Sequence, residues 1–320
     1  MMPDLAGIPR LEVRRGVPLA AYTRFGIGGA ADVLAETSDA GSLVEALRMA
    51  QACGQPVAVI GGGTNLIVAD EGFPGIVLRY TADRIRAEGT SVTVDAGAEL
   101  QALVDFTVER GLKGVETLTR IPGWVGAAVY GNAGAYGHSL SERISRVTST
   151  DGGSPRVLTN AECEFRYRES AFKRQKGWII LSAELELEGA DPAELRRVAD
   201  EIAEIRDHKF PPTMRCAGSI FKNLLYEELP AEVAALVPPA VVRGGKVAVG
   251  WFLEQAGAKG MVRGGIHVAD YHANLIYNAG GGTARDLGAL IAELKSRVRN
   301  RFGMELEEEV QYVGMGEKPA

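Results

Sequence analysis

The residues with the clearest potential for chemistry form a glycine loop, Gly61-Gly62-Gly63-Thr64-Asn65, between two apolar β-branched runs. Glycine has no Cβ, so successive amides can turn toward an anion, and a pyrophosphate can approach the main chain closely. The loop continues into Leu66-Ile67-Val68, which indicates a strand where a Rossmann or P-loop fingerprint requires a helix. These residues alone fit a phosphate-binding turn or an ordinary tight turn.

A second glycine-rich block runs from Ile121 to Gly137 and intersperses glycine with small apolar residues. So much glycine disfavours an ordinary stable helix. Small side chains let a backbone approach a flat or bulky group closely, but a tight Gly/Ala turn packed beneath another element has the same composition. The block therefore fits either role.

Polar side chains that could carry catalysis lie further along the chain. Arg168 can bind a carboxylate through paired hydrogen bonds, although strand alternation places Arg166 on the same face. Ser219 offers a hydroxyl group, and an isolated serine of this kind commonly satisfies a turn. Near the end of the chain, strand alternation divides the residues between two faces. One face carries Leu306, Glu308, Val310 and Tyr312, and the other carries Glu307, Glu309 and Gln311. The second face could hold a catalytic carboxylate, or it could be an ordinary exposed acidic face.

Composition excludes several other classes of protein. The chain has 320 residues, is 46% hydrophobic and carries a formal net charge of -6, which fits a soluble globular protein and argues against a nucleic-acid-coating surface. An anionic ligand must then be held by a local site. Widely spaced cysteines and histidines predict no metal centre and a reducing compartment. Residues 1–16 contain charges and prolines and no continuous apolar core, so we expect no signal peptide. No apolar run approaches about 20 residues, so we also expect a cytoplasmic protein with no membrane insertion.

The elements that must position these residues alternate along the first half of the chain. Thr37-Ser38-Asp39 predicts a capped helix that ends near Gly54 and leads into the strand before the glycine loop. A second helix is expected from Leu100 to Val108. Strands are expected at residues 75–80, 91–96, 143–150, 156–158, 162–167 and 178–187.

The remaining elements follow a domain boundary that we place after Gly189. A helix is expected from Asp191-Pro192 to Pro211-Pro212, because proline cannot continue it. A further helix begins at Thr283 and ends at Gly303, and a terminal strand is expected from Met304 to Val313.

Taken together and in order, the motifs resemble the UDP-N-acetylenolpyruvoylglucosamine reductase family over about Tyr22 to Gly314. They are GGGTNLIV, IPGWVGAAVYGNAGAYG, YRES, AGSIFKN, LEQAGAKG, HANLIYN and LEEEV. The resemblance implies an α+β fold with an N-terminal segment at 1–21. It further implies an FAD-binding domain of the PCMH or vanillyl-alcohol-oxidase type at 22–189 and a smaller α+β substrate-binding domain at 190–320, with its end strand near 304–313.

The resemblance also implies a cofactor, a reaction and the residues that serve them. Non-covalent FAD would contact Gly61, Gly62, Gly63, Thr64, Asn65, Leu66, Ile121, Pro122, Gly123, Gly126 and Ala127. Reduced by NADPH, the flavoprotein would convert UDP-N-acetylglucosamine enolpyruvate to UDP-N-acetylmuramate for peptidoglycan synthesis. Ser219 would donate the proton, Arg168 would stabilise the enolate, and Glu309 would orient or protonate the developing enol. Tyr167, Lys209 and Asn223 would contact the substrate, and the chain would be a monomer.

Two departures from the family pattern stand out. Gln311 occupies a position where members often carry Arg, so one cationic contact is in question. Residues 225–245 form an apparent insertion, for which we expect an extra surface helix. No long insertion follows Tyr167-Arg168, so the chain resembles the shorter of the family's two types.

Two other functions remain open from the sequence. An FAD oxidase of the same fold would better fit a histidine or cysteine flavin tether near the glycine loop, and neither residue lies there. A non-catalytic nucleotide-sugar-binding module would fit a colourless protein that does not take up FAD.

Overall fold

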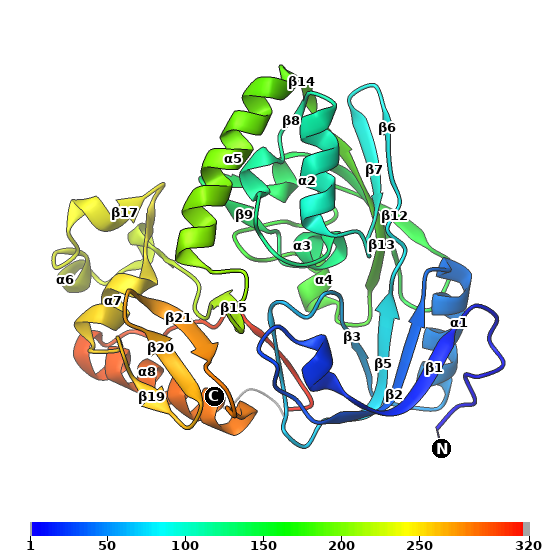
Figure 1. The fold of residues 1–320 in the computed structure, drawn as a ribbon, viewed down its shortest axis with the longest axis horizontal. Coiled ribbons are helices and arrows are strands. Elements are labelled where there is room, and N and C mark those ends of the chain that lie inside the picture. The colour runs from blue at the N-terminus through cyan, green and yellow to red at the C-terminus, as the bar shows by residue number, and fades with distance from the viewer. Residues whose placement is uncertain (1, 316–320) are drawn as a thin grey trace. The chain divides into compact units, whose positions relative to one another are not determined.

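The computed structural model describes residues 2–315 and divides into two compact units, each assembled from separate stretches of chain (Figure 1). Unit 1 comprises residues 2–17, 31–63 and 73–212. Unit 2 comprises residues 18–30, 64–72 and 213–315. The chain therefore passes from one unit to the other inside the glycine loop, between Gly63 and Thr64.

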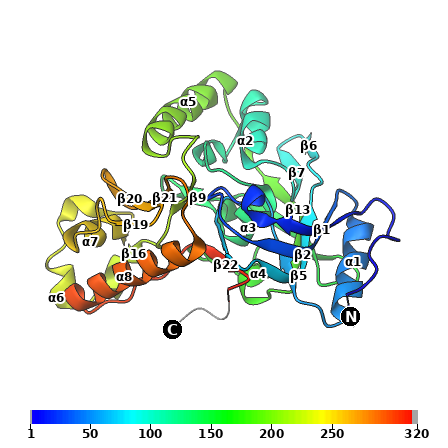
Figure 2. The ribbon, with the colours of Figure 1, turned by 60° about the horizontal axis from the view of Figure 1, so that its bottom comes forward.

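Unit 1 begins with a small sheet that carries the glycine loop. Its strands lie in the order β1 (Glu12–Pro18), β2 (Ala30–Thr37), β5 (Phe73–Tyr80), β3 (Val57–Val59), and β5 pairs in parallel with both β2 and β3. Helix α1 (Ala40–Ala52) connects β2 to β3, as parallel strands require, and buries Leu43 and Leu47. It lies beside β5 (Figure 2). Because β3 ends at Val59, the loop leaves the sheet directly.

The second sheet of unit 1 is antiparallel. Its strands lie in the order β12 (Arg156–Thr159), β11 (Ile144–Thr150), β13 (Ile179–Glu186), β7 (Ser91–Asp95), β6 (Ile85–Glu88). Four helices contribute buried residues to the hydrophobic core beside this sheet: α2 (Leu100–Glu109), α3 (Val125–Tyr130), α4 (Ala171–Arg174) and α5 (Pro192–Lys209). All four are labelled in Figure 1. Short elements complete the unit: β8 (Leu112–Lys113), η2 (Glu116–Leu118), β9 (Gly134–Ala135), β10 (His138–Ser139), η3 (Leu140–Glu142) and β14 (Glu188–Gly189).

Unit 2 contains another antiparallel sheet, with strands in the order β15 (Cys216–Ser219), β21 (His272–Asn278), β20 (Ile266–Ala269), β19 (Val262–Arg263). Helices α7 (Val249–Gln255) and α8 (Ala284–Phe302) share its hydrophobic core. A two-stranded parallel ladder pairs β22 (Gln311–Val313) with β4 (Leu66–Val68), and η1 (Leu19–Tyr22) also belongs to this unit.

The apparent insertion at 225–245 folds within unit 2. It contains η4 (Tyr226–Glu228), η5 (Pro239–Val241), the one-turn helix α6 (Ala231–Ala234) and the strand β17 (Val242–Arg243). Strand β18 (Lys246–Val247) pairs with both β17 and β16 (Leu224–Leu225). The expected extra helix is therefore present, although it is a single turn, and its Val233 is buried in the core of the unit.

The capping residues read from the sequence act as expected. Asp39 accepts a hydrogen bond from the Ser42 amide at 2.9 Å, and Asp191 accepts one from the Ala193 amide at 3.0 Å. At α8, Thr283 accepts the Asp286 amide, and Gly303 ends the helix in the left-handed conformation with φ 66°. Local chemistry therefore sets where these helices begin or end.

Three sequence expectations differ from the structure. Residues 162–167 form turns, not a strand, because Glu164 has φ 45° and Arg166 bridges back to Glu169. The terminal strand is confined to Gln311–Val313. Helix α5 belongs to unit 1, so that unit extends past the boundary placed after Gly189, because Leu195 and Ala199 pack into the core of unit 1.

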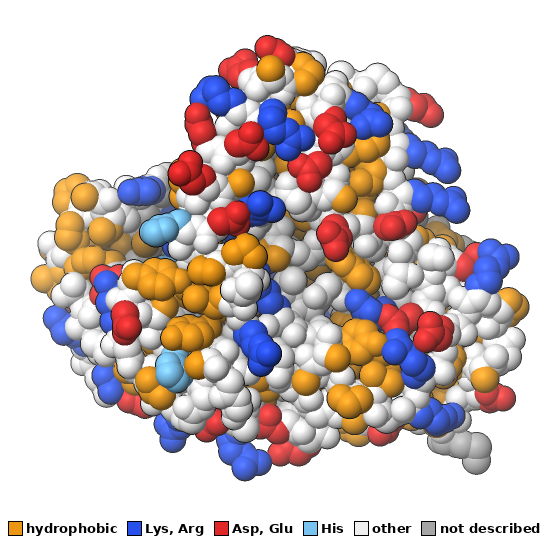
Figure 3. All heavy atoms as spheres, in the orientation of Figure 1, with side chains coloured by type: hydrophobic (Ala, Val, Ile, Leu, Met, Phe, Trp, Pro, Cys, Tyr) orange, Lys and Arg blue, Asp and Glu red, His pale blue; other side chains and the backbone are white. Residues whose placement is uncertain are grey.

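The surface bears charges of both signs. Figure 3 shows acidic and basic side chains interspersed on one face, with hydrophobic side chains between them. Within residues 2–315, no helix combines the length and apolar character that spanning a membrane requires.

Replacing Asp39 by Ala should destabilise the first sheet of unit 1. The Ser42 amide hydrogen bond, chiefly, lowers the pKa of Asp39, and loss of such a cap costs about 1 kcal/mol. Because the folded-state pKa is the lower one, this contribution should be present above about pH 4 and disappear as the pH falls through the folded-state value. Urea unfolding of the variant at pH 7 and at lower pH measures the effect. The exposed Asp32→Ala is the control, and an equal loss in both variants would contradict the assignment.

Candidate functional site

The glycine loop presents main-chain donors that the protein itself does not use. Ile60 remains tied to β5 through its amide, which donates to the Leu78 carbonyl at 3.1 Å. Beyond it, no hydrogen bond within residues 2–315 has the amide of Gly61, Gly62 or Gly63 as its donor. Gly63 is buried with φ 65°, and Gly61 and Gly62 are half-buried. A buried amide normally has a partner, so this loop fits an external acceptor such as a phosphate oxygen.

The second glycine-rich block lies against this loop within unit 1. A Cβ added to Gly62 would lie 3.2 Å from Cδ1 of Trp124 and 3.4 Å from Cα of Gly123. A Cβ on Gly61 would lie 3.5 Å from the Trp124 ring and 3.8 Å from the Ala127 methyl group. The structure thus brings together two motifs that are about 60 residues apart. A side chain on Gly62 would crowd Trp124, whereas one on Gly61 would make only ordinary van der Waals contacts.

Helix α3 of the block is pressed onto the end of the antiparallel sheet. The Val125 and Gly126 amides donate to the carbonyls of Ala98 and Ala96, each at 2.8 Å. A Cβ on Gly126 would lie only 2.8 Å from the Cβ of Ala96. Glycine at 126 is therefore required by close packing.

Arg79 is a residue of this site that sequence reasoning missed. Its guanidinium donates to the Gly61 carbonyl at 3.3 Å and lies 4.7 Å from the centre of the Trp124 ring. Its ion pair with Glu36, which also pairs with Arg14, holds it in place. Arg79 puts a cation beside the loop, as an anionic ligand on a protein of negative net charge would need. In the sequence, Arg79 is only a charged residue near the end of an otherwise apolar strand, and that pattern does not single it out.

Arg168 lies in a tight turn closed by reciprocal backbone hydrogen bonds between Arg166 and Glu169, at 3.0 and 3.1 Å. Its backbone is left-handed, with φ 56°, a conformation that costs a non-glycine residue about 1 to 2 kcal/mol. Its guanidinium donates to the carbonyls of Asn132 and Gly134, at 3.4 and 3.0 Å. The structure therefore brings Arg168 onto the second glycine-rich block. Strained backbone of this kind concentrates at functional sites.

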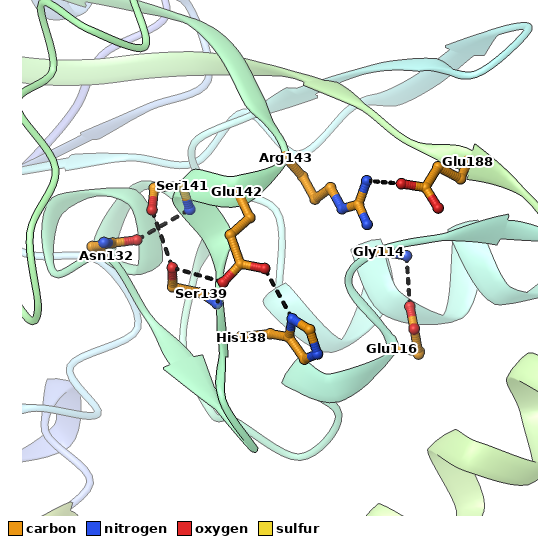
Figure 4. Close-up of polar contacts among 9 residues, drawn as sticks. All are labelled: Gly114, Glu116, Asn132, His138, Ser139, Ser141, Glu142, Arg143 and Glu188. Carbon is orange, nitrogen blue, oxygen red and sulfur yellow. Dashed lines mark hydrogen bonds and ion pairs between the residues drawn. The ribbon is translucent and has the colours of Figure 1, made fainter. Parts of the chain in front are cut away.

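Asn132, one of the two residues whose carbonyls accept from Arg168, is part of a polar network (Figure 4). The Asn132 side chain accepts the Ser141 amide at 3.1 Å and donates to the Arg166 carbonyl at 2.9 Å. Next to it, Glu142 accepts the Ser139 amide at 2.7 Å and contacts His138 Nδ1 at 2.9 Å (Figure 4). Although burial raises the pKa of Glu142, these bonds outweigh burial and lower it. The network fixes the loop from which Arg168 takes its orientation.

In unit 2, Ser219 follows a bulge at the end of β15. The register with β21 shifts between Cys216 and Ser219, and Gly218 has φ 73°. Bulges of this kind redirect a side chain and are common beside active sites. The following residues are tied to Asn274, which accepts the amides of Ile220 and Phe221, with its carbonyl and its side chain respectively.

Glu309 lies alongside this same segment. Its amide donates to the carbonyl of Ile220, the residue after Ser219, at 2.7 Å, and the Lys222 amide donates to the Glu307 carbonyl at 2.9 Å. The structure therefore brings Ser219 and Glu309 together on adjacent backbone segments, although 90 residues separate them in sequence.

The two neighbouring carboxylates have structural partners. Glu307 pairs with Lys222 at 2.5 Å, and the buried Glu308 pairs with Lys295 at 3.0 Å. Burial, and then the hydrogen bond and charge of Glu308, raise the pKa of Tyr312. Leu306, Glu308 and Val310 are buried as period-two alternation predicts, so Glu309 points to the other face.

The other predicted site residues fall in both units. Unit 1 holds Ile121, Pro122, Tyr167 and Lys209, while unit 2 holds Thr64, Asn65, Leu66 and Asn223. Lys209 ends α5 with Nζ 5.2 Å from the Phe210 ring centre, and Asn223 accepts the Val249 amide at 3.2 Å. Their contacts with ligands stay predictions. Within residues 2–315, no group of histidine, cysteine and acidic residues could hold a metal ion.

Comparisons with known proteins assign families to both parts of the chain. A family model described as an FAD binding domain matches residues 31–152. A model described as the C-terminal domain of UDP-N-acetylenolpyruvoylglucosamine reductase matches residues 210–313. Together with the mixed helix and strand content, these matches confirm the predicted fold class.

Full-length relatives carry the same name. The chain is 63% identical to UDP-N-acetylenolpyruvoylglucosamine reductase of Solibacter usitatus over 97% of this chain and 99% of the relative. It is 34% identical to the Bacillus subtilis enzyme of that name, covering 95% of this chain and 94% of the relative. A crystal structure of the Thermus caldophilus reductase superposes with a TM-score of 0.74 at 30% identity, over 95% of this chain and 99% of that one.

Gly126→Ala should weaken both the stability of unit 1 and its retention of FAD. Alanine in a helix is normally favourable, but the close contact with Ala96 outweighs that gain and should cost about 1 to 3 kcal/mol. Thermal unfolding and flavin content after gel filtration measure the two effects. Gly131→Ala is the matched control, since its Cβ would meet only the Ala127 carbonyl, at 3.5 Å, and its φ is -93°. Equal behaviour of the two variants would show that close packing at 126 is unimportant.

Proposed function

The chain belongs to the UDP-N-acetylenolpyruvoylglucosamine reductase family, and from that premise we propose how its residues carry out the reaction. It is an FAD-dependent oxidoreductase of peptidoglycan precursor synthesis, a UDP-N-acetylmuramate dehydrogenase. We propose that NADPH is the reductant and that UDP-N-acetylglucosamine enolpyruvate is the substrate. The observation that best supports the proposed reduction of the substrate is the adjacency of Ser219 and Glu309 on hydrogen-bonded backbone segments.

The cofactor site fits the proposal because the loop has donors without acceptors. The amides of Gly61, Gly62 and Gly63 would hold the FAD pyrophosphate, and Arg79 would add positive charge next to it. When bound, FAD supplies hydride to the enolpyruvyl double bond after reduction by NADPH. The protein contributes position, electrostatics and a proton.

Proton transfer is the task we assign to unit 2. Addition of hydride leaves carbanion character beside the substrate carboxylate, and Ser219 Oγ would give its proton to that carbon. Glu309, on the neighbouring segment, would orient or protonate groups around the developing enol. From unit 1, we assign to Arg168 the stabilisation of the enolate, because its guanidinium stays protonated and can form paired hydrogen bonds.

The cellular setting follows from the proposed reaction. A step in peptidoglycan precursor synthesis would place the protein in the cytoplasm and link it to cell-wall biogenesis, cell shape, the cell cycle and cell division. We propose that the chain acts as a monomer with no nucleic-acid partner, and that Tyr167, Lys209 and Asn223 contact the sugar nucleotide.

An anaerobic experiment tests the function directly. NADPH should bleach the yellow protein, and UDP-N-acetylglucosamine enolpyruvate should then restore the flavin absorbance. If oxygen and a small alcohol or sugar support turnover instead, the chain is an oxidase of the same fold. A colourless protein that cannot be reconstituted with FAD would indicate a non-catalytic nucleotide-sugar-binding module.

Ser219→Ala should separate the two half-reactions. Reduction of the flavin by NADPH should stay close to the wild-type rate, while reoxidation by substrate should slow by about 10²- to 10⁴-fold, since a positioned proton donor contributes that much. Stopped-flow absorbance under anaerobic conditions measures both rates. The exposed Ser296→Ala serves as a control in the same unit. An equal loss in both half-reactions would rule out the assigned role of Ser219.

A further inference from the structure

We propose that Asn65, besides its predicted contact with FAD, is a positioning residue for Glu309 and that Gln311 shares this task. The inference rests on the proposed function only for the role of Glu309 in reoxidation. All three residues belong to unit 2, together with Ser219.

The contacts converge on one backbone carbonyl. Asn65 Nδ2 donates to the Glu309 carbonyl at 3.1 Å, and Gln311 Nε2 donates to the same oxygen at 3.1 Å. The Gln311 amide in turn donates to the Asn65 carbonyl at 3.0 Å. Asn65 is therefore joined to the chain on both sides of Val310.

The side chains of Asn65 and Gln311 hold the backbone of Glu309, as the hydrogen bonds of a regular strand pair would otherwise do. Regular pairing of β22 begins only at Gln311, opposite Leu66, so Glu309 lies just before the ladder. Its amide is satisfied by Ile220 and its carbonyl by the two side-chain amides. With both polar backbone groups fixed, the direction of the Cα–Cβ bond of Glu309 is fixed as well.

The segment that carries Asn65 is itself firmly held. Ile67 and Val68 are buried, and the Ala69 amide donates to the Val313 carbonyl at 2.9 Å. Asp70 accepts the amides of Ala284 and Arg285, at 2.8 and 3.0 Å, at the start of α8. Asn65 therefore directly precedes a segment, residues 66–70, that is fixed by hydrogen bonds and burial, as a positioning residue requires.

The hydrogen bond also gives a role to Gln311, the residue that departs from the family pattern. The site of the expected arginine carries an amide that bonds to the Glu309 backbone. The side chain at 311 thus holds the backbone of Glu309 and does not contact the substrate itself. This task requires a hydrogen-bond donor at position 311, but it does not require a positive charge.

The test uses Gln311→Leu, which removes one donor to the Glu309 carbonyl and leaves the predicted FAD contacts intact. Reoxidation by substrate should slow by about tenfold to a hundredfold, because small misplacements of a catalytic group have effects of that size. Flavin reduction by NADPH and FAD affinity should not change. Gln311→Arg keeps a donor and should restore most of the rate. Asn65→Ala, assayed at saturating FAD, should reproduce the slow reoxidation.

A double-mutant cycle shows whether the effect passes through Glu309. In a Glu309→Gln background, adding Gln311→Leu should cause no further loss, whereas multiplicative losses would overturn the proposal. Hydrogen exchange of the 304–313 peptide gives a readout without substrate, and Gln311→Leu should raise it. Unchanged exchange together with unchanged reoxidation would also overturn the proposal. If the substrate fails to reoxidise the wild-type flavin, that result counts against the proposed function instead. The hydrogen-exchange result would still show whether Gln311 holds the Glu309 backbone in place.

Discussion

The parallel pairing of β4 with β22 is the interaction on which the rest of the site depends. It joins the strand after the glycine loop to the strand after Glu309, over a ladder of three residue pairs from Gln311 and Leu66 onward. Glu309 then lies one hydrogen bond from Ile220, and Ser219 adjoins it. Three segments far apart in sequence thus acquire a fixed order, which their buried apolar neighbours Ile67 and Val310 stabilise.

Local chemistry made much of the fold predictable. Asp39, Asp191 and Thr283 cap helices as their side chains suggest, and the strands of the antiparallel sheet follow their hydrophobic patterns. Residues 162–167 were mispredicted because of a local turn, but the other two errors lie where contacts between distant residues decide the structure. Residues 304–310 have the alternation of a strand, yet apart from a single bridge at Glu308 they pair with no strand, and α5 belongs to the core it packs against. Such contacts leave no local pattern in the sequence.

The candidate site shows the same division. The glycine motifs were recognisable because close approach requires residues without a Cβ, and the structure shows which neighbours impose this at Gly62 and Gly126. Arg79 was not recognisable, since only its position beside Gly61 and Trp124 gives it meaning. Choosing Glu309 among three consecutive glutamates required the resemblance to a family. The ion pairs of Glu307 and Glu308 now give those two neighbours separate structural roles.

The distance in sequence between β4 and its partner has a consequence for synthesis of the chain. Asn65 and Glu309 are 244 residues apart, so β4 leaves the ribosome long before β22 exists. Typical elongation rates are roughly 5 to 20 residues per second. The edge of β4 and the apolar side chains of Ile67 and Val68 therefore stay exposed on the nascent chain for on the order of 10 to 50 seconds. The ladder of unit 2 can therefore form only after Gln311–Val313 have been synthesised, and until then β4 is an unpaired strand edge that could pair with another chain.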